Sequence, residues 1–365
     1  MKRSITDLDK VKNLLKSNNK VAVQIAPAVR VAIGEEFGFS VGTNVVGKLV
    51  VSLKKVGFDY VYDVCNGADY TIIEESKELA TRFREKQNLP LFTSCCPVWV
   101  KFLEHSYPEK IKNLSTCKSP TEMLSRLIKH YDNDIKVVSV TPCVGKKIER
   151  TRHNVIDVCL TTKECAKLIK DAGINLAEQE DGVFDELFGI SSGAGTIFGV
   201  TGGVTEAILR TTTHLLNTHS SRVLEINEGE IKPFEPAKEI IRKNDSLREF
   251  SIMTEEGELK VGIVNGIASA RKLLSDIENG KEFHFVEFQN CKGGCVMGPG
   301  QPAFDKMKYN VDDIVKLRGR GLYDNDDRNS IKSSHTNRSV LDVYKNVGED
   351  KIEKMLHIHE KKCLE

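Results

Sequence analysis

The sequence predicts an α/β protein of two lobes, each built on a mainly parallel β-sheet flanked by helices. Short apolar runs rich in β-branched residues, such as 21–25 and 135–140, alternate with longer segments of helical character. Strand, helix and strand at this spacing are typical of parallel sheets. The chain has 365 residues, of which 40% are hydrophobic, so it can bury two cores. We expect lobes at about 20–150 and 151–300 and a C-terminal wrap over 303–365.

Elements of the first lobe follow from its apolar runs and its helix-start residues. The first strand, 21–25, is expected after a polar helix over 6–17. Residues 26–28 then open a helix over 29–37, with Pro27 near its first turn, where the missing N–H of proline costs little. The later elements expected are a helix over 44–55, a strand over 59–64, a helix over 67–87, a strand end at 91–93, helices from about 97 and over 120–131, and a strand over 135–140.

The second lobe is expected to begin with a strand over 157–160 and a helix over 162–172. The glycine-rich loop 191–203 matches neither a Gly-x-Gly-x-x-Gly fingerprint at a strand end nor a P-loop, so nucleotide binding is not favoured. His357 and His359 belong to a polar tail and are expected at the surface. The remaining elements expected are a hairpin over 249–266, a helix over 269–278, a strand over 284–288 and two short helices near the C-terminus.

Charge and composition exclude some classes of partner and indicate the compartment. The chain has 53 lysines and arginines against 52 acidic residues, so no strong field favours nucleic acid or an anionic membrane. Its N-terminus lacks a signal-peptide core, and no apolar run approaches the roughly 20 residues of a membrane span. Ten cysteines without an export signal favour reduced thiols with a metal or redox role. We therefore expect a cytoplasmic protein without membrane insertion.

Residues 285–302 form the most distinctive stretch, a short strand that breaks into a loop holding Cys291 and Cys295 among several glycines. Glycines let a bulky ligand approach the backbone and permit positive φ angles. Two thiolates in such a loop can grip one metal centre. A glycine-rich turn with two buried structural cysteines is an equally good interpretation of this stretch alone.

Two further cysteine loops follow strand ends. Cys95 and Cys96 are vicinal and point in opposite directions on an extended backbone, so one can bind a metal while the other faces a different cavity. A vicinal disulfide is the alternative, and a reducing compartment disfavours it. Cys143 follows the strand 135–140, where ligands collect in open α/β sheets. Lys146, three residues later, is either solvated surface or a donor to an anionic ligand.

The three loops at 93–99, 141–149 and 287–302 together resemble the signature loops of the iron-only (FeFe) hydrogenases. The resemblance spans about 20–358. It also includes the segments 26–37, 68–75 and 193–203 and the Ser334-His335 pair.

The resemblance implies an H-cluster between the two lobes, in which a 4Fe–4S cubane is joined through one cysteine sulfur to a diiron unit with CO, cyanide and a bridging dithiolate. Four thiolates are also what a cubane requires on chemical grounds. By motif position the cubane ligands are Cys96, Cys143, Cys291 and Cys295, with Cys295 bridging. The other residues implied at the site are Lys146 and the Ala26-Pro27 backbone as cyanide partners and Phe198 as a pocket wall.

The implied reaction is the interconversion of two protons and two electrons with dihydrogen, so protons must reach a buried site. Cys95 matches the family's cysteine beside the bridging amine of the diiron unit. Glu78, Ser115, Glu149 and Arg82 match the rest of a proton relay. Glu74, Glu78 and Arg82 form an i, i+4 row that, without the resemblance, is typical of a solvated helix face.

Three residues depart from the family pattern near the cluster. Thr141 and Gln289 replace methionines, and Pro299 replaces a glycine. Hydroxyl and amide groups raise local polarity, and proline stiffens the loop, so we expect a higher cluster potential and a bias towards hydrogen uptake. Cys65, Cys117, Cys159, Cys165 and Cys363 have no assigned role.

No cysteine precedes Cys65, so we expect a single H-cluster domain over 1–365 without an N-terminal ferredoxin-like domain. A ferredoxin-like carrier would then deliver electrons directly, and hydrogenase maturation proteins would supply the cluster. Two alternatives remain: a hydrogen-sensing or regulatory protein with low turnover, and a non-catalytic protein that carries cubanes alone. The Cys95 relay argues against the first, and the presence of both Lys146 and Cys95 argues against the second.

Overall fold

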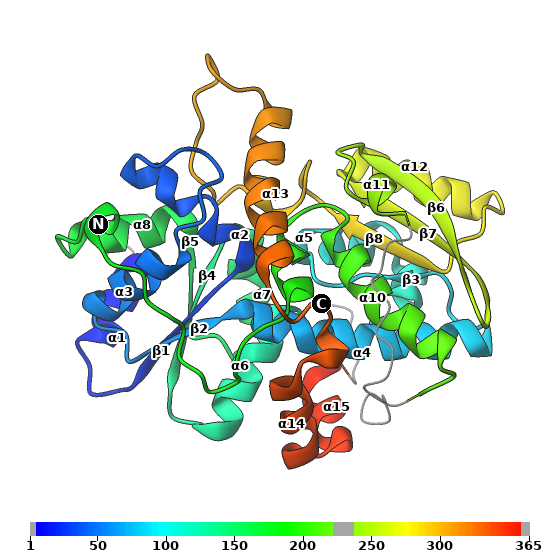
Figure 1. Ribbon diagram of the computed structural model, residues 1–365, viewed down its shortest axis with the longest axis horizontal. Coiled ribbons are helices and arrows are strands. Elements are labelled where there is room, and N and C mark those ends of the chain that lie inside the picture. Colours follow the sequence, from blue (N-terminus) through cyan, green and yellow to red (C-terminus); the bar gives the residue numbers. More distant parts are fainter. Residues whose placement is uncertain (1–4, 222–236, 359–365) are drawn as a thin grey trace.

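Two four-stranded sheets lie on opposite sides of helix α13 (Val311–Arg328) in the computed structural model, which describes residues 5–221 and 237–358 (Figure 1). The first sheet has the order β2-β1-β4-β5 and is parallel throughout. The second has the order β3-β8-β7-β6 and is parallel except for the β6–β7 hairpin. The predicted α/β class with two mainly parallel sheets is confirmed. The strands are β1 Val21–Ile25, β2 Tyr60–Asp63, β3 Leu91–Phe92, β4 Lys136–Thr141, β5 Val158–Thr161, β6 Leu247–Thr254, β7 Gly257–Asn265 and β8 Phe285–Gln289.

The predicted boundary between lobes at residue 150 is wrong. Strand β5 follows that boundary but pairs with β4 in the first sheet. Strand β3 precedes it but pairs with β8 in the second sheet. A two-residue strand such as β3 carries no local signal for the sheet it joins, because only hydrogen bonding to a distant partner decides it.

Helices cover both sheets, and among the described residues none is both long and apolar enough to cross a membrane. One predicted helix, 29–37, is instead a short helix, α2 (Pro27–Arg30), followed by a separate 3₁₀ turn over Ile33–Phe37, because the Arg30 carbonyl accepts a hydrogen bond from Val45 N (3.0 Å). The other α-helices are α1 Asp7–Leu15, α3 Val46–Val56, α4 Val64–Glu85, α5 Pro97–Ser106, α6 Pro120–Tyr131, α7 Gly145–His153, α8 Thr162–Asp171, α9 Gly193–Thr196, α10 Gly203–Asn217, α11 Lys238–Ile241, α12 Ile267–Glu278, α14 Arg338–Val347 and α15 Glu349–Leu356.

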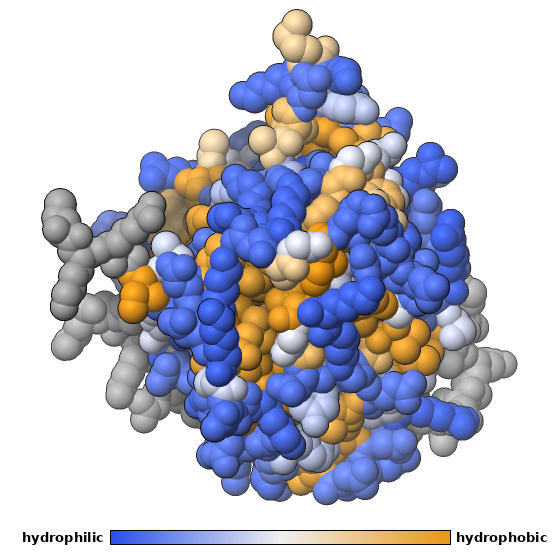
Figure 2. All heavy atoms as spheres, turned by 90° about the vertical axis from the view of Figure 1, so that its left-hand side faces the viewer, coloured by the Kyte–Doolittle hydropathy of each residue, from blue (hydrophilic) through white to orange (hydrophobic). Residues whose placement is uncertain are grey.

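The first sheet is buried on both faces, as parallel sheets usually are. On β1, Val21, Val23 and Ile25 pack against α1, α3 and α8, whereas Ala22 faces a second core with α4, α6, α14 and α15. Figure 2 views the side of the molecule where α1, α3 and α8 lie. Hydrophilic side chains cover most of that face, with apolar atoms visible between them, so these helices present polar surfaces outward.

In the second sheet, side chains of β8 alternate between two cores. Phe285 joins α4, α9 and α10, whereas Phe288 packs with Trp99 of α5 and with α12. Between them, the buried Glu287 carboxylate accepts from Gly202 N at 2.8 Å and from Thr205 N at 2.7 Å. This carboxylate therefore ties the strand before the third cysteine loop to the start of α10.

Helix α4 joins the two lobes. It begins at Val64, three residues before the predicted start, because Asp63 caps it by accepting from Cys65 N at 2.9 Å. Ala68 and Ile72 pack in the core of the second lobe, whereas Tyr70 and Ile73 pack in the core of the first. The helix is thus buried on opposite faces, and its carboxylates Asp69, Glu74 and Glu75 lie inside the molecule.

Candidate active site

The three predicted cysteine loops meet in one pocket at the carboxyl ends of β1, β3, β4 and β8, which belong to both sheets. Its empty volume is about 890 Å³. Ligand sites of α/β proteins commonly lie at such strand ends. Every residue predicted at the cluster lines this pocket: Ala26, Pro27, Cys95, Cys96, Thr141, Cys143, Lys146, Phe198, Gln289, Cys291, Cys295 and Pro299.

The thiols of the pocket cysteines interact electrostatically. The nine cysteines of the described chain are all free thiols, so the vicinal disulfide is excluded there. Burial raises the pKa of the Cys291 thiol to about 12, and the charges of Cys96 and Cys143 add to it. Burial and the other three thiolates likewise raise the pKa of Cys295. Gathered thiolates of this kind require a cationic partner, and an iron–sulfur cluster supplies one.

Backbone amides lie near two of the sulfurs. Cys96 occupies the N-cap position of α5. Burial raises the pKa of Cys96 overall, although the Trp99, Asn290 and Val98 amides lower it. Gly145 N lies 3.2 Å from Cys143 Sγ. These amides are suited to cluster thiolates, so the donor set fits the implied group.

Aromatic stacking locks the first cysteine loop to the third. The Trp99 ring stacks on Phe288 with centroids 3.7 Å apart, and its Nε1 donates to Thr93 O at 3.2 Å. Thr93 Oγ1 in turn accepts from Phe288 N at 3.0 Å. The loops carrying Cys96 and Cys291 are therefore held by one interlocked unit.

Glycines in the third loop are required by close packing. Gly293 and Gly294 have positive φ angles, 75° and 86°, as predicted for this loop. A Cβ on Gly294 would lie only 2.6 Å from Thr201 N, and one on Gly298 only 2.3 Å from Pro142 O. The glycines therefore let this loop contact both the second cysteine loop and the segment before α10.

Lys146 lines the pocket, and its ammonium group forms an ion pair with Glu149. Its Nζ lies 2.8 Å from Glu149 Oε2 and 3.2 Å from Cys95 O. Burial lowers the pKa of Lys146, but Glu149 and the nearby thiols raise it overall, so the ammonium stays charged. Glu149 Oε2 also accepts from Ser119 Oγ at 3.0 Å. Contrary to prediction, Glu149 thus lies with Lys146 and outside the hydrogen bonds around Ser115 and Glu78.

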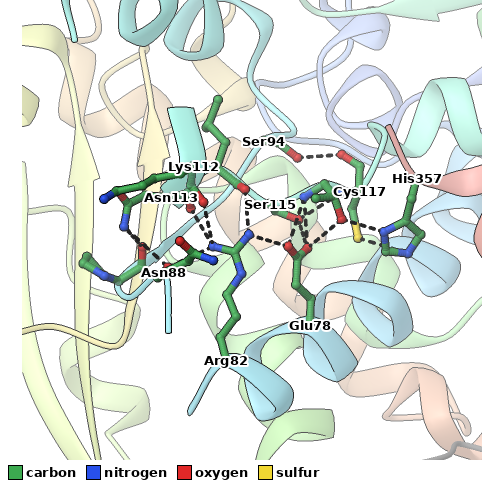
Figure 3. Close-up of polar contacts among 12 residues, drawn as sticks. Glu78, Arg82, Asn88, Ser94, Lys112, Asn113, Ser115, Cys117 and His357 are labelled. Carbon is green, nitrogen blue, oxygen red and sulfur yellow. Dashed lines mark hydrogen bonds and ion pairs between the residues drawn. The ribbon is translucent and has the colours of Figure 1, made fainter. Parts of the chain in front are cut away.

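The other predicted relay residues are brought together along α4 (Figure 3). Ser115 Oγ donates to Glu78 Oε2 at 2.9 Å, and Arg82 Nη2 donates to Glu78 Oε1 at 2.6 Å. The side chains of Glu78 and Arg82 are 12% and 11% exposed, so this end of the line approaches solvent.

Glu75 is a candidate relay residue that the sequence analysis missed. It is fully buried, and neither carboxylate oxygen has a hydrogen-bond partner within the described ranges. Burial and the charge of Glu78 raise the pKa of Glu75 to about 8. The pKa of Cys95 is raised mainly by burial and next by the charge of Glu75. Glu75 thus couples electrically to both Cys95 and Glu78. Its i, i+3 spacing from Glu78 was the available signal, since the predicted row through Glu74 follows another face.

The departures from the family pattern differ in their contacts. Thr141 Oγ1 lies 3.3 Å from Cys143 O and 3.5 Å from Cys159 Sγ, so its hydroxyl is already engaged. Gln289 Oε1 is buried without a partner in the part of the chain that the structure describes. Of the residues that depart from the family pattern, only Gln289 therefore has a side-chain polar atom without a hydrogen-bond partner in the described residues.

His357 is buried, which contradicts its predicted surface position. It is 9% exposed, and its ring lies 2.7 Å from Thr116 Oγ1 and 2.9 Å from Glu74 Oε2. The backbone after α15 pairs with the connector before α6, where Ile358 N donates to Thr116 O at 2.8 Å. That long-range pairing has no local sequence signal. His359 and Cys363 lie outside the described residues.

Comparison with known proteins agrees with this geometry. Residues 19–299 match the family described as iron only hydrogenase large subunit, C-terminal domain, and residues 312–359 match iron hydrogenase small subunit. Iron hydrogenase 1 of Clostridium pasteurianum is 37% identical over 97% of this chain, which spans 63% of that relative's length. The periplasmic [Fe] hydrogenase large subunit of Nitratidesulfovibrio vulgaris is 39% identical over 85% of this chain and 75% of the relative.

Solved structures agree as well. A variant of [FeFe]-hydrogenase HydA1 from Chlamydomonas reinhardtii superposes with a TM-score of 0.78 at 32% identity, covering 97% of this chain and 98% of that one. A more distant relative, the cytosolic Fe-S cluster assembly factor narfl of Danio rerio, is 26% identical over 92% of this chain and 85% of its own length. From its family match, its relatives and its fold, the chain belongs to the iron-only hydrogenase family.

Proposed function

We propose that this chain is the catalytic domain of an FeFe hydrogenase, which interconverts protons and electrons with dihydrogen at an H-cluster. One observation carries the proposal: a four-cysteine pocket adjoins Cys95, which couples to a buried line of carboxyl and hydroxyl groups. The cubane would be held by Cys96, Cys143, Cys291 and Cys295, with Cys295 as the bridging thiolate. Lys146 would donate to one cyanide, and the backbone at Ala26 and Pro27 would lie beside the other.

When bound, the H-cluster supplies the iron chemistry that joins electrons and protons into dihydrogen. Cys95 Sγ would exchange a proton with the pocket, and Glu75 with Cys95. Ser115 Oγ and Glu78 Oε2, which are hydrogen-bonded to each other, would carry the proton further outward. A carboxyl group whose pKa is raised to about 8 can both hold and release a proton near neutral pH, which suits Glu75 to this position.

The walls of the pocket would keep water from the cluster. Phe198, Pro97 and Val98 contribute apolar surface to it. Exclusion of water forces protons through the relay and strengthens the pull of Lys146 on an anionic ligand.

Partners and location are part of the proposal. A ferredoxin-like carrier would exchange electrons with the cubane, hydrogenase maturation proteins would install the diiron unit, and the protein would act in the cytoplasm. One relative is named as periplasmic, so fractionation of the source cells is the direct check on location. Reduced ferredoxin should support hydrogen evolution by the matured protein.

Infrared spectroscopy of the matured protein, followed by a hydrogen assay, tests the function. CO and cyanide bands with turnover are expected. Bands without appreciable turnover would indicate a hydrogen sensor. Absence of bands despite bound iron would indicate a cubane-only protein, a function that the assembly factor in the family makes relevant. The Cys95 and Lys146 positions favour the catalytic outcome, because a lone cubane needs neither.

A further inference from the structure

Hydrogen bonds around His357 continue the relay beyond Glu78 (Figure 3). Thr116 Oγ1 lies 3.2 Å from Glu78 Oε2 and 2.7 Å from His357 Nδ1. The opposite ring nitrogen, Nε2, lies 2.9 Å from Glu74 Oε2. Lys77, whose side chain is 18% exposed, lies 3.2 Å from Glu74 Oε1. The line therefore runs without a gap from the relay towards the surface.

Arg82 blocks the other oxygen of Glu78. Its guanidinium lies 2.6 Å from Glu78 Oε1. A guanidinium is not deprotonated in proteins, so it can hold a carboxylate but cannot hand a proton on. Glu78 Oε2 is left as the oxygen that both receives from Ser115 and faces Thr116. The guanidinium is further fixed by the carbonyls of Asn88, Lys112, Asn113 and Leu114.

We propose that His357 carries protons between Glu78 and solvent, as the outer station of the relay. The inference rests on the proposed hydrogenase function. In the outward direction, the Glu78 carboxyl proton passes to Thr116 Oγ1 while the Thr116 hydroxyl proton moves to His357 Nδ1. The proton on His357 Nε2 leaves to Glu74 or water, and exchange with water restores the ring. Glu78 loses one proton, solvent gains one, and no electron moves.

The backbone places the ring at this position. Ile358 N donates to Thr116 O at 2.8 Å, and Lys118 N donates to Leu356 O at 3.0 Å, so the residues on either side of His357 are tied to the connector. Lys118 Nζ also donates to the His357 carbonyl. The segment is part of 312–359, the stretch that matches the hydrogenase small subunit. The outer station thus comes from a different family segment than the rest of the relay.

A carboxylate lies beside the His357 ring. Burial raises the pKa of Glu74, but His357, Lys77 and Tyr344 lower it overall, so Glu74 stays a carboxylate beside Nε2. Burial lowers the pKa of Lys118 to about 8. The titratable and charged groups facing this site are Glu74, Lys77, Glu78 and Arg82 of α4, Cys117 and Lys118 of the connector, and Tyr344 of α14.

The test compares His357→Gln and Thr116→Val with Thr71→Val in the matured holoenzyme. The first two interrupt the line at separate points. Thr71→Val removes a buried hydroxyl of α4 that donates to Gly67 O (3.1 Å) but leaves the Glu78–Thr116–His357 contacts intact. Hydrogen turnover should fall about 10²-fold in the first two variants, at the lower end of the range for a lost proton-transfer group, and stay at the parent value in the third. Infrared bands should be unchanged in all three.

Two readouts separate proton transfer from a structural role. Added imidazole should restore turnover in His357→Ala but not in Thr116→Val, and the pH profile should change in both. Parent-like turnover and pH profile in His357→Gln and Thr116→Val would overturn the inference while leaving the hydrogenase proposal standing. A parent protein without infrared bands or turnover would overturn both.

A metal interpretation of the same cluster gives a different result. Glu78, Cys117 and His357 offer ligand atoms that all lie within 4.8 Å of one another. Dialysis against EDTA should leave the turnover of the parent holoenzyme unchanged. If EDTA lowered turnover to the His357→Gln value and Zn²⁺ restored it, His357 would be a metal ligand and the relay role would be overturned.

Discussion

The cluster pocket and the proton relay meet at Cys95 but are built in different ways. The pocket takes its cysteines from loops after three strands in two sheets. The proposed relay takes Glu75 and Glu78 from one buried helix, α4, on which Arg82 holds Glu78 in place. Loops at strand ends can place ligands around a large group, whereas a helix spaces single groups along a line. The difference predicts that pocket variants lose the cofactor, and relay variants keep it but lose proton transfer.

The largest effect is expected from removing a pocket ligand. Cys143→Ala should lose cluster iron and all hydrogen turnover, because a cubane needs four thiolates. Cys159→Ala is the matched control, since Cys159 is buried, contacts Thr141 and does not line the pocket. Iron analysis and turnover are the measurements. Equal iron loss in both variants would show that Cys143 is not a specific ligand.

The second-largest effect is expected at Cys95, where the pocket and the proposed relay meet. Cys95→Ala should keep iron and the infrared bands while turnover falls about 10²- to 10⁴-fold, the range of a lost acid–base group. Cys95→Ser should be nearly as inactive because a hydroxyl is a far weaker acid than a thiol, and Cys95→Asp should retain some rate. Loss of iron in Cys95→Ala would move this residue from the relay to the pocket and exchange the roles of the vicinal pair.

Substitutions of Glu75 and Glu149 test which carboxylate transfers protons. Glu75→Gln should lower turnover about 10²-fold, since an amide cannot pass a proton. Glu149→Gln should retain proton transfer, because Glu149 bonds Lys146 and Ser119 rather than the relay. The solvent isotope effect on turnover measures proton transfer directly. If Glu149→Gln were the slower variant, the predicted relay membership of Glu149 would be restored.

Burial of Glu75 also makes stability depend on pH. Its pKa is raised from 4.5 to about 8, so the folded protein holds a proton there that the unfolded chain releases. The associated stability is full below pH 4.5 and is lost as pH rises through about 8, on the order of 2 kcal/mol between pH 6 and 8. Thermal unfolding of cluster-free parent and Glu75→Gln over this interval measures it. The parent should lose stability and the variant should not; parallel curves would contradict the assignment.

The smallest effect concerns the pocket wall. Gln289→Met should lower the cluster potential and shift the current ratio towards hydrogen evolution, because Gln289 has an unpaired polar atom beside the pocket. Thr141→Met should change less, since the Thr141 hydroxyl already contacts Cys143 O and Cys159. Protein-film voltammetry measures both. Identical potentials in Gln289→Met and the parent would remove this residue as the source of the bias.

Sequence alone determined most of the pocket. Cys96, Cys143, Cys291 and Cys295 sit in short motifs that follow strands, and the resemblance of those motifs to hydrogenase loops identified all four, which line one pocket. The glycines around Cys295 predicted a loop with positive φ angles, which Gly293 and Gly294 have. The hairpin before β8 and the parallel strands likewise followed from patterns of apolar residues.

Only the tertiary structure decided the contacts across the chain. Periodicity placed Glu74, Glu78 and Arg82 in one row, yet packing separates Glu74, which bonds His357, from Glu78, which bonds Ser115. The membership of β3 and β5, the burial of His357 and the orphaned oxygens of Glu75 depend on segments distant in sequence. The physical reason is that a local pattern fixes which way a side chain points along its own element, whereas its partner and its pKa are set by what folds against it.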